Sequence, residues 1–152
     1  MTDEVHYQRP SAMATWLNRF IGFLVAHGMG PSYMRVLDVR GRKTGRVIST
    51  PVNILAVDGV DYLVAPRGVT HWVRNARVSG RVSLRRGRDR HTYRLEELPP
   101  EARPSILKAY LTTYAREVQQ YFTVKDGSEL AAFRAIADKH PVFRLHETDE
   151  AL

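Results

Sequence analysis

Residues 34–65 read M-R-V-L-D-V-R-G-R-K-T-G-R-V-I-S-T-P-V-N-I-L-A-V-D-G-V-D-Y-L-V-A. β-Branched residues are frequent in three runs of this stretch, 34–40, 46–57 and 60–65, which indicates strands. Two turn signals separate the runs. The first is a turn with two glycines over 41–45, and the second is Asp58-Gly59, the strongest hairpin signal in the chain. Three antiparallel strands are therefore expected.

The next segment adds a second hairpin. A short helix over 71–79 is expected, with Thr70 as its N-cap and Gly80 at its C-terminal end. Strands over 81–86 and 90–96 follow, joined by Gly87-Arg88-Asp89. Tight antiparallel hairpins dominate and no βαβ alternation occurs, so the fold class is α+β: a small closed or split antiparallel β-barrel with outer helices.

Helical patterns flank the strands on both sides. A first helix is expected over 11–27, a long helix over 100–122 and a further helix over 128–139. A last strand is expected over 142–145. Residues 1–152 are predicted to form one domain, with the N-terminal helix in 1–30, the barrel strands in 34–96, helices in 100–139 and the last strand in 141–146.

The first helix has an apolar face wider than packing on one sheet requires. Burial between a sheet and a neighbouring helix explains this face, and peripheral membrane contact or a dimer contact is the alternative. The longest apolar stretch, 13–25, is interrupted by Asn18 and Arg19 and is too short to span a bilayer. Acidic residues stand near Met1, where a signal peptide carries basic residues. We therefore predict a cytoplasmic protein, with membrane association as the alternative.

Composition excludes several chemistries. Cysteine is absent, which excludes disulfides, thiolate nucleophiles and cysteine-ligated metals. The six histidines are scattered and form no H-E-x-x-H pattern, so no metal site is expected. No G-x-S-x-G, Walker or G-x-G-x-x-G pattern is present. The sequence therefore assigns no catalytic residue.

The positive charge is concentrated in the middle of the chain. The net charge is +7, and residues 35–94 hold 14 basic and four acidic side chains. Such a concentration indicates an anionic partner at one place on the molecule.

Three motifs in this basic segment suit such a partner. The turn G-R-K-T-G-R over 41–46 offers backbone N–H groups and cations, as an anion nest does. The run A-P-R-G over 65–68 ends a strand, and H-W-V-R-N-A over 71–76 begins a helix whose dipole favours an anion. Taken singly, the three also read as a solvated hairpin tip, a surface charge and a core tryptophan.

These motifs, in this order, resemble the deazaflavin (F-420)-dependent nitroreductase family, as does the closing H-P-V-F-R-L over 140–145. The resemblance implies a split β-barrel like those of flavin reductases and pyridoxamine-phosphate oxidases. It also implies coenzyme F-420, an 8-hydroxy-5-deazaflavin with a phosphate and a polyglutamate tail, in preference to FMN or FAD. A polyanionic tail matches the basic segment.

By this resemblance, four groups of residues contact the cofactor. Family members tend to have Ser where this chain has Pro66, and proline has neither a hydroxyl nor an N–H; the proton donor therefore stays unassigned. Arg42, Lys43 and Thr44 would hold phosphate or tail carboxylates; Thr50, Pro51 and Val52 would line the ring; Arg67 would hold phosphate, with Pro66 and Gly68 beside it in the cofactor site; Trp72 and Asn75 would flank the cofactor.

The expected function is an oxidoreductase that transfers hydride from reduced F-420 to a quinone, enone or nitro acceptor. Its partner is a small-molecule electron acceptor, and the chain is expected to be a monomer or a homodimer. One alternative is a non-catalytic split-barrel protein that binds a flavin, haem or lipid. A second is a basic nucleic-acid-binding domain, which is not favoured because exposed aromatic residues for base stacking are missing from the basic hairpin.

Overall fold

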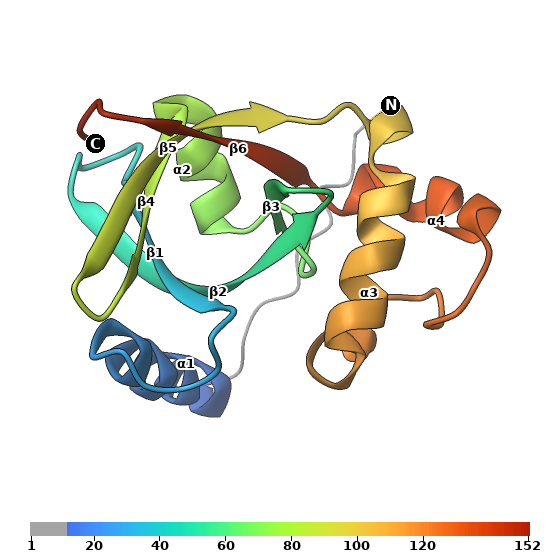
Figure 1. Cartoon of the computed structure of the whole chain (residues 1–152), viewed down its shortest axis with the longest axis horizontal. Coiled ribbons are helices and arrows are strands. Elements are labelled where there is room, and N and C mark those ends of the chain that lie inside the picture. The colour runs from blue at the N-terminus through green and yellow to red at the C-terminus, as the bar shows by residue number, and fades with distance from the viewer. Residues whose placement is uncertain (1–11) are drawn as a thin grey trace.

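The computed structural model describes residues 12–152, with side chains described from Arg19 onward. Its centre is a closed antiparallel barrel with the strand order β1-β2-β3-β6-β5-β4 (Figure 1). This is the α+β barrel architecture that the hairpin pattern predicts. The strands are β1 (Met34–Arg40), β2 (Val47–Val57), β3 (Val60–Val64), β4 (Arg81–Arg86), β5 (Asp89–Glu97) and β6 (Val142–Thr148).

Local hairpins build most of the barrel, and two pairings between distant segments close it. The β1–β2, β2–β3 and β4–β5 pairs are the hairpins of the sequence pattern. Strand β1 also pairs with β4, for example Leu37 opposite Leu84. The last strand, β6, lies between β3 and β5, with Leu63 opposite Phe143 on one side and Leu95 opposite Leu145 on the other. Closure leaves the described strands with a neighbour on each side.

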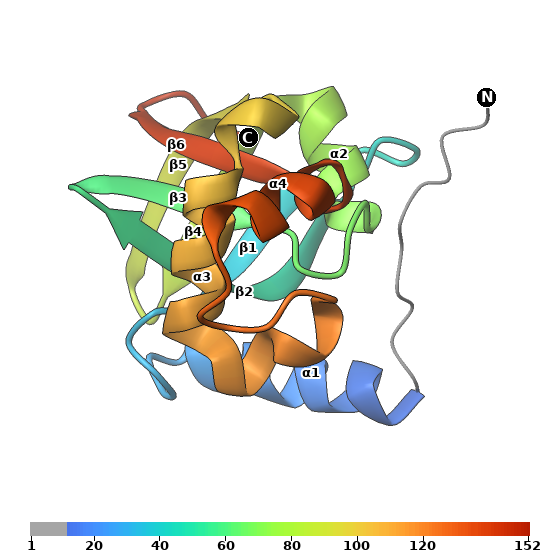
Figure 2. The same cartoon turned by 90° about the vertical axis from the view of Figure 1, so that its right-hand side faces the viewer.

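Helices surround the barrel on three sides (Figures 1 and 2). The first, α1 (Ala12–Ala26), packs on β1, β2 and β4; the expected start at Ser11 lies outside the described residues. The prediction of one continuous helix over 100–122 is wrong in detail. A 3-10 turn, α3 (Pro104–Val118) and a second 3-10 turn replace it, and the backbone at Tyr114 leaves helical geometry with ψ near 27°. Helix α4 (Leu130–Ile136) follows.

Two hydrophobic clusters hold these layers together. One fills the barrel, where the inward side chains of the strands meet α2 (His71–Ser79). The other lies outside the barrel, between α3, α4 and the outer faces of β2, β3 and β6. The inner cluster includes Leu37, Val39, Leu63, Val73, Ala76, Val82, Leu84 and Phe143, and the outer one Leu55, Val64, Leu107, Leu111, Phe133 and Val142.

Helix α2 closes one end of the barrel. Val73 and Ala76 are fully buried in the inner cluster, and Gly80 ends the helix in the left-handed conformation, as predicted. Thr70 is the N-cap residue, but its hydroxyl makes no capping hydrogen bond. The expected side-chain cap is therefore wrong, and the first amides of α2 are not satisfied by this hydroxyl.

Candidate functional site

The G-R-K-T-G turn is a compact loop closed by its own hydrogen bonds. The Gly41 N–H donates to the Arg46 carbonyl at 2.7 Å, and the Gly45 N–H donates to the Gly41 carbonyl at 2.9 Å. The Thr44 hydroxyl accepts from the Arg46 N–H at 3.2 Å. Gly45 has φ of 73°, where a side chain is strained. The Lys43 side chain is exposed at the tip of this turn.

Asn75 fastens this turn to α2. It is 1% exposed, and its Oδ1 accepts from the Arg42 backbone N–H at 3.1 Å and from the Arg42 guanidinium at 2.7 Å. Two motifs that lie 33 residues apart in sequence therefore meet directly. The Arg42 guanidinium is held by a neutral amide, so its positive charge stays available to an anion.

The loop with Pro66, Arg67 and Gly68 leads straight into α2. The Gly68 N–H donates to the Ala65 carbonyl at 3.1 Å, and Gly68 has φ of 84°, which turns the chain toward the helix. Thr70 is 8% exposed, and its buried hydroxyl has no hydrogen-bond partner among the described residues. An orphaned hydroxyl beside a helix N-terminus and an arginine suits a phosphate.

Trp72 belongs partly to the core. Its ring centroid lies 5.7 Å from that of Phe143 on β6, and it is half-buried against the inner cluster. The core interpretation of this tryptophan therefore holds for the face that meets Phe143. Its position in the first turn of α2 keeps it beside Arg67 and Thr70 in sequence.

The three residues expected to line the ring divide between the two faces of β2. Thr50 lies opposite Leu37 and therefore points inward, as does Val52, which packs against the inner cluster. Pro51 points outward, on the same face as Asn53. A flat ring on the outer face of β2 would contact Pro51 and Asn53 with their side chains, and Thr50 and Val52 only through the backbone.

The structure adds a polar network that the sequence did not reveal. Glu117, on α3, accepts a hydrogen bond from the Tyr33 hydroxyl and another from Asn53 Nδ2 at 2.7 Å. The hydrogen bond to Glu117, with partial burial, raises the pKa of Tyr33 to about 12. These three residues lie 20 to 84 positions apart in sequence, so no local pattern could join them. Only the docking of α3 beside β2 does so.

Two tyrosines of α3 are packing residues. Tyr110 is 3% exposed, and burial raises its pKa well above the usual range. Tyr114 is 6% exposed, and its hydroxyl donates to the Ile54 carbonyl. Burial also raises the pKa of Tyr114. Both side chains therefore anchor α3 to the barrel.

Several arginines of the basic hairpin β4–β5 already have partners. Arg85 donates to buried Asp38 through two nitrogens, at 2.6 and 3.2 Å, and Arg90 lies 3.4 Å from the same carboxylate. Arg86 donates to five backbone carbonyls of the segment 28–34. Arginines held this way are poorly placed to neutralise a nucleic-acid backbone.

The barrel with its outer helices defines the class of the protein: a split β-barrel of the kind found in flavin reductases and pyridoxamine-phosphate oxidases. The family model for F420H(2)-dependent quinone reductases matches residues 14–128. The chain therefore belongs to this family of F-420-dependent reductases. The resemblance seen in the turn, strand-end and helix motifs is confirmed at the level of family and fold.

Solved structures share this fold at low sequence identity. Atu2129 from Agrobacterium tumefaciens, a protein of unknown function, superposes with a TM-score of 0.56 at 19% identity over 93% of this chain. This chain spans 58% of the length of Atu2129. A structure described as a domain-swapped dimer gives 0.56 at 18% identity, over 89% of this chain and all of that one.

An F420-H2 dependent reductase, FDR-A, gives a TM-score of 0.51 at 20% identity over 76% of this chain and 95% of its own. At such identities these similarities support the fold alone. No curated protein matches the chain significantly. None of the helices described is both long and apolar enough to cross a membrane, and the residues described contain no cluster of ligands that could hold a metal ion.

Proposed function

We propose that this chain is an F-420-dependent oxidoreductase with a quinone as its preferred electron acceptor. The observation that carries the proposal is the double hydrogen bond from Arg42 to Asn75, which brings the G-R-K-T-G turn onto α2. Membership of the F420H(2)-dependent quinone reductase family supports the same cofactor and names the acceptor class.

The residues at this end of the barrel fit the anionic parts of the cofactor. Arg42 and Lys43 supply positive charge from the turn, and Thr44 lies beside them. Arg67 and Gly68 precede α2, where the orphaned Thr70 hydroxyl and the helix N-terminus add donors. A phosphate with a polyglutamate tail would pair with these groups.

The ring would lie along β2, flanked by α2. Pro51 and Pro66 offer flat apolar contacts, with Thr50 and Val52 contributing backbone and Trp72 and Asn75 closing the α2 side. When bound, reduced F-420 supplies a hydride to the acceptor. The protein's own task is to orient ring and acceptor.

A proton must also reach the reduced acceptor, and Pro66 cannot supply it. The Tyr33–Glu117 pair lies next to Asn53, on the outer face of β2. The Tyr33 phenol donates its single proton to Glu117 and has a pKa raised to about 12, so it is too weak an acid to supply this proton near neutral pH. We therefore propose that solvent water supplies the proton in the proposed reaction.

The test is a two-stage measurement with pure protein. Fluorescence quenching of F-420 first gives the dissociation constant, expected in the micromolar range. Oxidation of F-420H2 is then followed with menadione, cyclohexenone and a nitrofuran at equal concentration, and menadione is expected to react fastest. Absence of binding at micromolar protein would remove the whole proposal.

Binding without reduction of any acceptor would instead favour the non-catalytic alternative, in which the barrel holds a flavin, haem or lipid. FMN, FAD and haem are therefore included in the binding series. Tighter binding of FMN or FAD than of F-420 would contradict the cofactor assignment.

Peripheral membrane contact through α1 belongs to the same proposal, because menaquinone-like acceptors partition into lipid. Phe20 and Phe23 on α1 are 49% and 60% exposed. Such side chains suit the boundary between headgroups and acyl chains. Flotation with anionic liposomes, compared between the native chain and Phe23→Ser, tests it; equal recovery of both would contradict it.

A further inference from the structure

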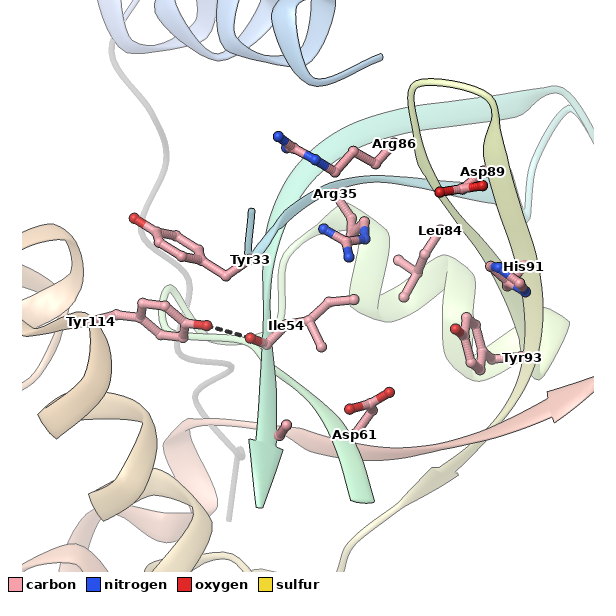
Figure 3. A pocket seen from close by; sticks show the side chains of 11 residues that line it. Tyr33, Arg35, Ile54, Asp61, Leu84, Arg86, Asp89, His91, Tyr93 and Tyr114 are labelled. Carbon is pink, nitrogen blue, oxygen red and sulfur yellow. Dashed lines mark hydrogen bonds between the residues drawn. The ribbon is translucent and has the colours of Figure 1, made fainter. Parts of the chain in front are cut away.

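A cavity lies at the barrel end opposite α2. Its volume is about 530 Å³, and strands β1 to β5 contribute to its wall together with Tyr33 and Tyr114 (Figure 3). None of the cofactor-binding residues assigned above lines it, and Tyr33 is the one member of the Tyr33–Asn53–Glu117 network that does. Along β2, Ile54 lies four residues beyond Thr50, which is about 13 Å of strand. The inner cluster separates this mouth from α2.

Two opposite charges point into this cavity from inside the barrel. Arg35 lies two residues before inward-facing Leu37 on β1, and Asp61 lies two residues before inward-facing Leu63 on β3, so both side chains share the inward face. Figure 3 shows both side chains turned into the mouth. Inward positions of a small barrel normally carry apolar side chains, so a half-buried charge there needs a reason.

These two charges do not neutralise each other. Arg35 uses one guanidinium nitrogen for the carbonyls of Ser32 and Met34, and it forms no ion pair among the described residues. Asp61 pairs through its backbone in the β2–β3 ladder, but its carboxylate forms neither a hydrogen bond nor an ion pair with any described residue. Each therefore keeps charged hydrogen-bonding capacity that faces the cavity.

The remaining polar groups of the mouth lie at its rim or have partners. Arg86 is held by loop carbonyls. Asp89 and His91 are exposed, and His91 Nδ1 lies 2.8 Å from Glu147 Oε1. Between Arg35 and Asp61 the wall is formed by Leu84, Ile54 and the half-buried ring of Tyr93.

We propose that this mouth, called here the barrel-mouth site, binds a small zwitterion. The anionic group pairs with Arg35, the protonated amine pairs with Asp61, and a short apolar body lies against Leu84, Ile54 and Tyr93. The volume falls within the range of small-molecule sites. Two charge-assisted contacts in a partly enclosed cavity favour a ligand with both charges over one with either alone. The inference is independent of the proposed redox function.

The test uses matched aromatic probes on the native chain. The zwitterions are 4-(aminomethyl)benzoate and the longer 4-(2-aminoethyl)benzoate, which cover two charge separations; 4-methylbenzoate and 4-methylbenzylamine carry one charge each. Amide chemical shifts give the affinity and the location. We expect one zwitterion to bind about ten-fold more tightly than either singly charged probe, with shifts around Arg35, Asp61 and Leu84.

Two variants then assign the contacts. Asp61→Asn and Arg35→Gln are each expected to abolish the ten-fold preference for the zwitterion. The matched control is Asp58→Asn in the same β2–β3 hairpin, where Asn tolerates the φ of 50°; it should leave the preference unchanged.

Three results with the native chain would overturn the proposal: equal affinity for all four probes, amide chemical-shift changes located away from the barrel-mouth site, or no binding by either zwitterion. These affinity and chemical-shift measurements use the native chain, so they do not depend on whether a variant folds. A preference that survives both Asp61→Asn and Arg35→Gln would also overturn it.

Discussion

The buried side-chain amide of Asn75 holds the G-R-K-T-G turn against α2. Asn75 lies one turn after Trp72 on α2, where the resemblance implied that it would flank the cofactor. Its Oδ1 accepts two hydrogen bonds from Arg42, and the residue is 1% exposed. The anion-binding turn is thus positioned by a neutral group that does not compete for the anion.

Asn75→Leu should therefore lower both stability and cofactor affinity. It leaves the Arg42 N–H without its acceptor, at a cost of about 1–3 kcal/mol. Denaturant unfolding and F-420 titration measure the two effects. Asn75→Asp keeps the acceptor, so stability should be largely retained while the added negative charge still weakens F-420 binding. Val78→Ala on the exposed face of the same helix is the control, and an equal effect there would contradict the assignment.

The Tyr33–Glu117 contact predicts a pH dependence at high pH. The pKa of Tyr33 is raised from 10.0 to about 12, chiefly by its hydrogen bond to Glu117. The folded state therefore holds this proton more tightly than the unfolded chain does. Its contribution to stability is complete below pH 10 and is lost as pH rises toward 12.

Comparison of the native chain with Tyr33→Phe isolates this contribution. The difference in unfolding free energy between the two should shrink between pH 10 and 12, measured by denaturant titration at each pH. Glu117→Gln should bring the pKa of Tyr33 back toward 10, followed by tyrosinate absorbance. A difference that stays constant with pH would mean that the hydrogen bond is not formed in solution.

Among the elements, the connection from α1 to β1 depends on a residue of another strand. Arg86 on β4 donates to carbonyls of Gly28, Met29, Gly30, Pro31 and Met34, at 2.7 to 3.4 Å. One planar guanidinium thus satisfies a loop that has no regular structure of its own. The loop in turn sets where Tyr33 enters the network with Glu117.

Arg86→Met keeps the aliphatic stem and removes these donors. Amides of residues 28–34 are then expected to exchange with solvent at least about ten-fold faster, with a loss of about 1–2 kcal/mol in global stability. Hydrogen exchange followed by mass spectrometry measures the loop directly. Arg88→Met at the tip of the same hairpin provides the comparison. Unchanged exchange in the loop would show that Arg86 does not hold it.

At the scale of the whole molecule, the uneven charge should govern cofactor binding. The net charge is +7, and its excess lies within residues 35–94. Exposed charges are screened by salt over about 10 Å at 0.1 M. F-420 affinity should therefore fall roughly ten-fold between about 0.05 and 0.5 M salt.

The control ligand for this salt dependence is the deazaflavin ring compound that lacks both the phosphate and the glutamates of F-420. Its affinity should change little over the same range, because only the ring would contact the protein. Fluorescence titration measures both series. Parallel salt dependences would imply that the tail does not use the basic segment.

Local sequence patterns determined much of this architecture. The hairpins β1–β2, β2–β3 and β4–β5 and the extent of α2 follow from turn chemistry and strand alternation, which act between near neighbours. The first helix, the last strand and the two C-terminal helices also follow, although the interruption at Tyr114 does not. The motifs in 41–46, 65–68, 71–76 and 140–145 also indicated the family, as a set.

Only the tertiary structure decided how these parts combine. The placement of β6 between β3 and β5, the contact of Asn75 with Arg42, and the meeting of Asn53, Tyr33 and Glu117 join residues far apart in sequence. The inward aim of Arg35 and Asp61 depends on barrel closure, because a strand's two faces acquire an inside and an outside only when the sheet closes. Such contacts arise from packing, which no local pattern encodes.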